Sequence, residues 1–199
     1  MTVLFTGSVI VTTTHLEQDD PADLRAAREP AEPALIGRVG ELAPEFSRFL
    51  YTAVGGDWYW LDRRGWNLAE WVAWLSRPGS ETWVAWFHGA PAGYVELAAD
   101  IHDGATHVEI AYFGLLARFT GRGLGGQLLT QGLSKAWTLH ERWPVLPEVS
   151  RVWVHTCTLD GPYALRNYLA RGFRIHHTTQ AEQDVPDDPP GPWPDSANT

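Results

Sequence analysis

A predicted strand leads into a glycine-rich loop and then a helix in the second half of this chain, and this segment constrains the fold most. The strand covers residues 108–116, the loop covers 120–126, and apolar residues at helical spacing follow from Leu124 onward. Such a loop offers free backbone N–H groups and the positive end of the helix dipole, which together favour phosphate or pyrophosphate. The segment therefore predicts a site for a phosphate-bearing ligand.

Length, charge and cysteine content narrow the class of protein. The 199 residues suit one domain with a sizeable core. A formal net charge of −9 disfavours nucleic acid as the main ligand, because such sites need a basic face. The single cysteine, Cys157, excludes an intrachain disulfide and a cysteine-rich zinc site, and we expect no metal. Residues 1–14 do not read as a signal peptide and no run suits a membrane span, so we expect a cytoplasmic protein without membrane contact.

Hydrophobic periodicity divides the chain into strands and helices. Asn67 and Glu70 form a capping pair that begins a helix, which puts the apolar residues Leu68, Trp71, Val72 and Leu75 on one face. We expect residues 1–180 to form one domain, and the Pro- and Asp-rich residues 181–199 to be disordered or draped on the surface. The other predicted strands cover 9–14, 34–39, 82–87, 92–98, 151–156 and 173–178, and the other predicted helices cover 41–54 and 162–171.

The glycine loop also matches the dinucleotide fingerprint G-x-G-x-x-G through Gly121, Gly123 and Gly126. That fingerprint should follow a strand at once, inside a parallel βαβ unit. Here residues 117–120 intervene, and the three preceding strands are joined by tight turns into an antiparallel meander. The surroundings therefore argue against a dinucleotide site, and the loop lacks the Gly-Lys-Ser/Thr ending of a P-loop.

The element order and two motifs resemble the GNAT superfamily of acetyl-CoA-dependent N-acetyltransferases. In that family the loop reads Arg/Gln-x-x-Gly-x-Gly/Ala, and residues 120–125 match both glycines, with Thr120 replacing Arg or Gln. In the second motif, Tyr168 lies four residues before Gly172-Phe173. The resemblance covers about residues 80–178 and implies an α/β fold of the α+β type, in which helices flank a mixed, largely antiparallel central sheet.

The resemblance also implies a mechanism in which an amine directly attacks the acetyl thioester. Glu109 lies eleven residues before Thr120, the separation that holds the glutamate base in the histone-acetylating branch of the family. Apolar neighbours would exclude water from Glu109 and strengthen it as a base. The alternatives are a solvent-facing carboxylate, a pair with His107, or Glu96 as the base. Tyr168 matches the family's general acid, and the alternative for it is packing on the core face of its helix.

The resemblance implies acetyl-CoA as co-substrate, with its pantetheine arm along the main chain after the strand and its pyrophosphate at the glycine loop. Residues 153–160 look like a bacterial subgroup of GNAT proteins that have no assigned substrate. The predicted cofactor-binding residues are Leu115, Leu116, Ala117, Thr120, Gly121, Arg122, Gly123, Leu124, Gly125 and Gly126.

The acceptor is predicted to be a primary amine of a small molecule or a peptide. The tryptophan-rich residues 57–74 could hold it, with Asp57 or Asp62 attracting a cation, although each tryptophan could equally pack the helices. We interpret His155 as a partnered histidine. The alternative function is a non-catalytic module that binds acyl-CoA as a sensor. A nucleotide-binding protein is a more remote alternative. The oligomeric state is not predicted, and a homodimer is possible.

Overall fold

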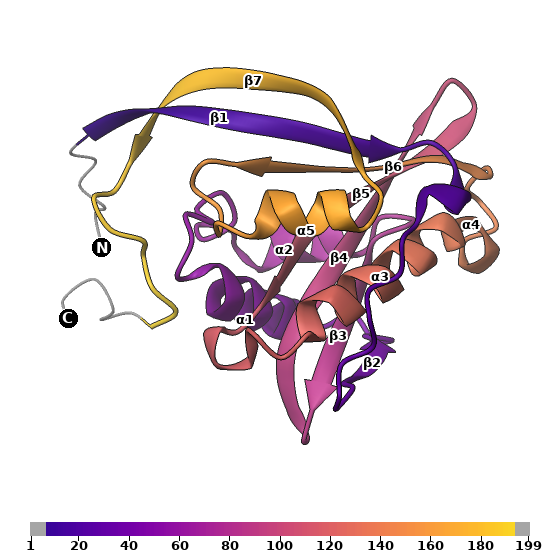
Figure 1. The fold of residues 1–199 in the computed structure, drawn as a ribbon, viewed down its shortest axis with the longest axis horizontal. Helices are drawn as coiled ribbons and strands as arrows, with labels where there is room; N and C mark the ends of the chain where they lie inside the picture. Colours follow the sequence, from indigo (N-terminus) through magenta and orange to yellow (C-terminus); the bar gives the residue numbers. More distant parts are fainter. Residues whose placement is uncertain (1–6, 194–199) are drawn as a thin grey trace.

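The computed structural model describes residues 7–193 as one mixed sheet with helices on both faces (Figure 1). Its strands are β1 (Gly7–Gln18), β2 (Leu35–Arg38), β3 (Glu81–Phe87), β4 (Ala90–His102), β5 (Ala105–Leu115), β6 (Val149–Cys157) and β7 (Arg174–Val185). Its helices are α1 (Pro44–Gly55), α2 (Leu68–Leu75), α3 (Leu124–Trp137), α4 (Leu139–Arg142) and α5 (Ala164–Ala170), with two short 3₁₀ helices, η1 (Pro21–Asp23) and η2 (Ala117–Phe119).

The seven strands lie in the order β2-β3-β4-β5-β6-β1-β7. Every neighbouring pair is antiparallel except β5 and β6, which run parallel. This topology confirms the predicted α+β class with a largely antiparallel sheet. The parallel pair needs a long crossover between its strands, and α3 and α4 provide it.

Strand alternation sends neighbouring side chains to opposite faces of the sheet and so builds two cores. Val95 and Val108 face α3 and α5 in the larger core, whereas Val84 and Tyr94 face α1 in the smaller one. Each fully buried aliphatic side chain contributes about 1.5–3 kcal/mol to folding. The two cores hold the sheet rigidly between the helices.

The capping pair before α2 is confirmed in both directions. Oδ1 of Asn67 accepts from the N–H of Glu70 at 3.1 Å, and Oε2 of Glu70 accepts from the N–H of Asn67 at 2.7 Å. Of the apolar residues of this helix only Trp71 is buried, and Leu68 is 62% exposed. The eight-residue helix contacts α1 on one narrow side, which leaves its remaining apolar residues partly or fully exposed.

Strand β7 extends beyond its predicted end at residue 178 and through residues 181–185, which we expected to be disordered or draped on the surface. It pairs with β1 as far as Gly7 opposite Val185. Every side chain of β7 before Val185 is exposed, so the strand shows no apolar alternation that would reveal it. Further on, the N–H of Gly191 donates to the carbonyl of Gly56 at 2.8 Å, and residues 194–199 lie outside the described part. Within residues 7–193, no helix is long and apolar enough to cross a membrane.

Candidate active site

The parallel strands β5 and β6 stay together for only part of their length. Their recorded pairs run from Thr106 opposite Val149 to Glu109 opposite Trp153. Within residues 7–193, β5 after Glu109 pairs only with β4, and β6 after Trp153 pairs only with β1. We call this divergence, between residues 110–115 of β5 and 154–157 of β6, the fork. The β5 side of the fork is an unpaired main-chain edge, which can accept an extended ligand as an added strand.

A β-bulge in β5 sets which side chains line the fork. Glu96 pairs with Tyr112 and Leu97 pairs with Ile110, so Ala111 is the extra residue. The bulge reverses the alternation after it and turns Tyr112 toward α1. Phe113 therefore faces α3 and α5, where its ring lies 6.1 Å from that of Tyr168.

The predicted glycine loop lies between the end of β5 and the start of α3. Gly121 and Gly123 have φ angles of 75° and 82°, in the left-handed region that favours glycine. Among the described residues no side chain caps α3, and its first helical hydrogen bond runs from the N–H of Gln127 to the carbonyl of Gly123 at 3.2 Å. The N–H groups of residues 124–126 are therefore free of helical partners, as the prediction requires.

Two predicted contact residues are already used within the turn before the loop. The Thr120 hydroxyl donates to the carbonyl of Ala117 at 2.8 Å. The N–H of Leu116 donates to Ala92, and its carbonyl accepts from Phe119. The free main-chain edge therefore lies on residues 110–115 and includes Leu115, whereas Leu116 and Ala117 have few groups left for a ligand.

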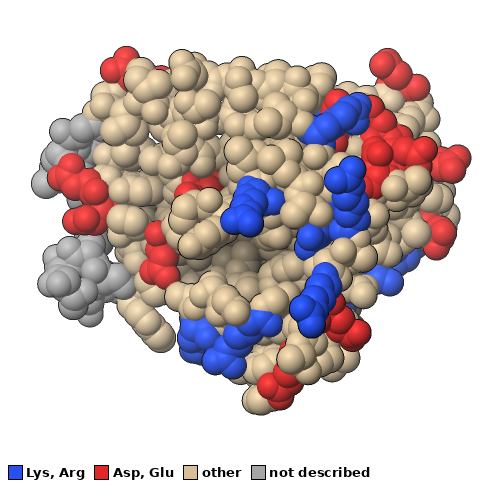
Figure 2. Space-filling model, in the orientation of Figure 1, with Lys and Arg blue, Asp and Glu red and all other residues tan. Residues whose placement is uncertain are grey.

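Basic side chains surround this region although the whole chain is acidic. Figure 2 shows Lys and Arg side chains grouped around a hollow in the face that carries α3 and α5. Arg122 belongs to the loop, and Nη1 of Arg171 lies 3.1 Å from the position that a Cβ on Gly126 would take. Nε of Arg171 is buried and has no hydrogen-bond partner within residues 7–193. Together with the uncapped helix, this arrangement suits an anionic group.

Glu109 lies at the base of the fork and pairs with a histidine of the neighbouring strand. Its Oε1 is 3.3 Å from Nδ1 of His155, and the two side chains are 20% and 49% exposed. The pair raises the pKa of His155 above its ordinary value, while partial burial opposes the shift. His155 was expected to have a partner, and that partner is Glu109. His107, which was considered as an alternative partner of Glu109, stacks on His102 instead.

Glu96 occupies a very different environment from Glu109. Its carboxylate is buried, and its Oε1 accepts from Nη1 of Arg63 at 2.7 Å and from Nε1 of Trp74 at 2.8 Å. Burial raises the pKa of Glu96, and Arg63 opposes that shift. The Arg63 guanidinium also lies over the rings of Trp66, Trp74 and Tyr112, at 4.7, 4.1 and 4.3 Å from their centroids. Sequence reasoning missed Arg63, since no local pattern links it to Glu96.

Asp62 presents an exposed carboxylate on the same side of the sheet as Glu109. It accepts hydrogen bonds from the hydroxyls of Tyr51, at 2.7 Å, and Tyr112. Burial and the nearby carboxylate raise the pKa of both phenols, which therefore stay protonated and hold Asp62 in place. Asp57, the other predicted anion, lies elsewhere, in a groove along α1.

Tyr168 lies in the larger core, on the other face of the sheet from Glu109. It is 6% exposed and packs between the rings of Phe113 and Phe173. Its hydroxyl has no hydrogen-bond partner in the described part of the chain, and burial raises its pKa, so the phenol stays protonated. The packing alternative is thus realised, while the contact with Phe113 still places the ring beside the fork.

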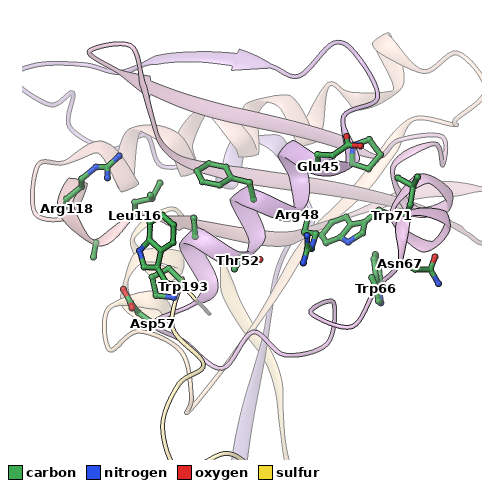
Figure 3. Close-up of a pocket in the computed structure, with 16 residues that line it drawn as sticks. Glu45, Arg48, Thr52, Asp57, Trp66, Asn67, Trp71, Leu116, Arg118 and Trp193 are labelled. Atoms are coloured by element: carbon green, nitrogen blue, oxygen red, sulfur yellow. The ribbon is translucent and has the colours of Figure 1, made fainter. Parts of the chain in front are cut away.

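A groove of about 990 Å³ runs along the outer face of α1, from Leu116 and Arg118 at one end to Trp66 and Trp71 at the other (Figure 3). The inner face of α1 packs on the sheet, so the helix separates this groove from Glu109. Cys157 is not a candidate nucleophile, because burial raises the pKa of its thiol. Across residues 7–193, no cluster of three or more His, Cys, Asp or Glu side chains is arranged to hold a metal.

Comparison with known proteins finds a matching family and solved structures with a similar fold. The model of the acetyltransferase (GNAT) family matches residues 44–173. Similar structures include a conserved protein of unknown function from Staphylococcus epidermidis (TM-score 0.56, 16% identity, 88% of this chain and 62% of that chain). A protein assigned to the GNAT family from Novosphingobium aromaticivorans is also similar (TM-score 0.54, 17% identity, 88% of this chain and 66% of that chain). So is a GCN5-related N-acetyltransferase from Sphaerobacter thermophilus (TM-score 0.52, 16% identity, 92% of this chain and 54% of that chain). The chain thus corresponds to 54–66% of the length of these structures. No curated protein matches it in sequence.

Proposed function

The chain belongs to the acetyltransferase (GNAT) family, and we propose that it transfers an acetyl group from acetyl-CoA to a primary amine of a small molecule or peptide. The observation that carries this proposal is the fork, which opens directly after Glu109 and beside the glycine loop. The unpaired strand edge of residues 110–115 has the carboxylate of Glu109 at one end and the free N-terminus of α3 beyond the other, which suits an acyl-CoA laid along the edge.

The donor would lie along the fork. Its pyrophosphate would meet the N–H groups of residues 121–126, with Arg122 and Arg171 supplying positive charge. The uncapped start of α3 and the unpaired Nε of Arg171 support this placement. The pantetheine arm would pair with the free edge of residues 110–115. The donor supplies the activated acetyl thioester.

Glu109 would act as the base toward the acceptor. An ammonium group must lose a proton before its nitrogen can attack a carbonyl. Glu109 is partly exposed at the fork, whereas Glu96 is buried and neutralised by Arg63. We therefore assign the base to Glu109 and a structural role to Glu96. The nitrogen then bonds to the acetyl carbon, the carbon–sulfur bond breaks, and the sulfur leaves with a proton.

Tyr168 would assist the leaving sulfur from the other face of the sheet. Its protonated phenol has no hydrogen-bond partner among residues 7–193 and lies against Phe113 on the fork strand. A hydrogen bond to the departing thiolate would lower the barrier to carbon–sulfur cleavage.

The acceptor would approach on the face that carries Glu109 and Asp62. Two carboxylates on this face favour an acceptor that arrives as a cation. The tyrosine pair that holds Asp62 would keep its charge pointed toward the acceptor.

A thermal-shift comparison of CoA, acetyl-CoA, ATP and NAD tests the donor assignment. A ligand at 100 times its Kd stabilises the native state by about 2.7 kcal/mol. We expect stabilisation by CoA and acetyl-CoA and little by the other two. Stabilisation by ATP or NAD alone would contradict the proposal. Binding of CoA without turnover of any amine in a broad panel would favour the non-catalytic sensor, and sedimentation would test the homodimer, which also stays a proposal.

A further inference from the structure

Three histidines lie side by side on neighbouring strands, next to Glu109. In the sheet register, His15 of β1 is opposite His155 of β6 on one side and His177 of β7 on the other. The rings of His15 and His177 stack with centroids 4.2 Å apart and an interplanar angle of 8°, and the rings of His15 and His155 are 5.9 Å apart. We call His155, His15 and His177 the histidine row. It extends from the ion pair with Glu109 to the outermost strand.

Strand alternation puts the row on the face of the sheet where the amine would react. Leu16 and Val154 belong to the larger core, so their neighbours His15 and His155 face the other way. Val108 is likewise in the core, so Glu109 shares this face. Titratable side chains on four adjacent strands, β5, β6, β1 and β7, are therefore lined up on one surface.

The proposed reaction produces a proton that must leave the site. An ammonium acceptor loses two protons in becoming an amide: one departs on the CoA thiol, and the other has to reach solvent. Glu109 must give up this second proton before the next turnover, because a protonated carboxyl cannot act as the base. Glu109 is only 20% exposed, and substrates bound at the fork would cover it further, so the proposed function needs a path from Glu109 to water that the substrates leave open.

We propose that His155 takes this proton from Glu109 and that His15 and His177 pass it to solvent at the outer edge of β7. The proposal rests on the proposed function. His155 lies at contact distance from Glu109, and the 5.9 Å between the rings of His155 and His15 suits transfer through a bridging water. His177, at the end of the row, is exposed.

Charges around the row order its members by proton affinity. Glu109, Asp160 and Asp62 all raise the pKa of His155. Burial lowers the pKa of His15, and so do the neighbouring His177, His155, His176 and Arg151. The two shifts both favour a proton on His155 over one on His15.

The remaining groups near the outer end are already paired. His176 contacts the ring of His177 and lies 3.1 Å from Glu17. Glu17 also binds Arg151 and Arg174. Arg174 pairs with Asp19 as well, so two carboxylates offset the two guanidinium groups at that end of the row, and the ring of His177 stays exposed.

Histidine titration by NMR on the full chain tests the row without turnover. We expect Glu109→Gln to lower the pKa of His155, and His155→Gln to raise the pKa of His15, since a neighbouring positive charge is lost. His107→Gln is the matched control, because His107 lies on β5 two residues before Glu109 and stacks on His102. It should leave the pKa of both row histidines unchanged. A His15 pKa that does not respond to His155→Gln would overturn the proposal.

Activity then tests the use of the row in catalysis. We expect His155→Gln to lower kcat about tenfold or more, to change its pH profile, and to recover partly with added imidazole, while the KM for acetyl-CoA stays constant. His15→Gln should cause a smaller fall, and His107→Gln none. If the wild type is active and His155→Gln leaves the pH profile unchanged, the proton path is contradicted and the proposed function is not. A wild type with no transferase activity would contradict both the proposed function and the proton path.

Discussion

Glu96 and Arg63 form a buried ion pair, with 2.7 Å between Oε1 and Nη1 and side-chain exposures of 2% and 4%. The pair joins the loop before α2 to the centre of the sheet. It also distinguishes the two candidate bases, because the carboxylate of Glu109 meets only a half-exposed histidine. The geometry thus favours Glu109 for proton transfer and Glu96 for structure.

Arg63→Met should reduce the free energy of unfolding by about 3–5 kcal/mol, because it leaves the buried Glu96 carboxylate without a compensating charge and with only the N–H of Trp74 as a partner. Arg77→Met is the matched control. Arg77 pairs with Asp100 at 3.2 Å, where the side chains are 34% and 65% exposed, and such a pair is worth at most about 1 kcal/mol. Urea unfolding measures both variants. Equal losses in the two would show that the buried pair has no special structural role.

Gly121→Ala should weaken CoA binding about tenfold, a change of about 1.4 kcal/mol. A side chain at a φ of 75° strains the loop by about 1–2 kcal/mol and shifts the N–H groups that would hold the pyrophosphate. Gly104→Ala imposes similar strain at a φ of 82° in the turn between β4 and β5, and a Cβ would meet nothing within 4 Å at either glycine. Calorimetry should find CoA affinity unchanged in the control; parallel losses would point to a general folding effect.

Tyr168→Phe should lower the rate of CoA release about 10–100-fold and leave stability nearly unchanged. Its hydroxyl has no partner within residues 7–193, so its removal breaks no hydrogen bond, while the ring keeps its packing. Tyr163→Phe, at the start of the same helix and 75% exposed, should have no effect on rate. A full rate in Tyr168→Phe would restrict Tyr168 to the core-packing role.

The pair of Glu109 with His155 should make stability depend on pH in a defined direction. The folded-state pKa of His155 lies above its reference value of 6.5, so the pair contributes fully below about pH 6.5. The contribution disappears as pH rises through the raised value. Because His155 is half-exposed, the size should stay below about 1 kcal/mol.

Glu109→Gln should therefore lower the free energy of unfolding more at pH 6 than at pH 9. His155→Gln should show the same dependence, and the double variant should add little to either. Additive effects of the two substitutions at pH 6 would contradict a direct interaction.

The elements that sequence predicted well are those whose local pattern and tertiary role agree. The capping pair of Asn67 and Glu70 fixes the start of α2 without help from the rest of the chain. The turn residues between β3, β4 and β5 similarly determine the meander. The length of β7 was underestimated, because main-chain pairing with β1 holds this edge strand, and its exposed side chains show no apolar pattern.

The candidate site was predictable only where it is local in sequence. The glycine loop forms from consecutive residues, so its geometry follows from its local sequence and its position before α3. The partners of Glu109 and Glu96 come from other elements, His155 from β6 and Arg63 from the loop before α2, and depend on strand order and register. No spacing rule in one sequence gives such contacts.

The most direct test of acetyl transfer with Glu109 as base is CoA-thiol release over a panel of primary amines, with the acetyl-CoA Kd measured in parallel. We expect the wild type to release thiol with at least one amine. Glu109→Gln should lose about 100-fold or more in rate and keep its acetyl-CoA Kd, while Glu182→Gln, on exposed β7, should match the wild type. Equal rates in the wild type and Glu109→Gln, or no release by the wild type with any amine, would contradict the account.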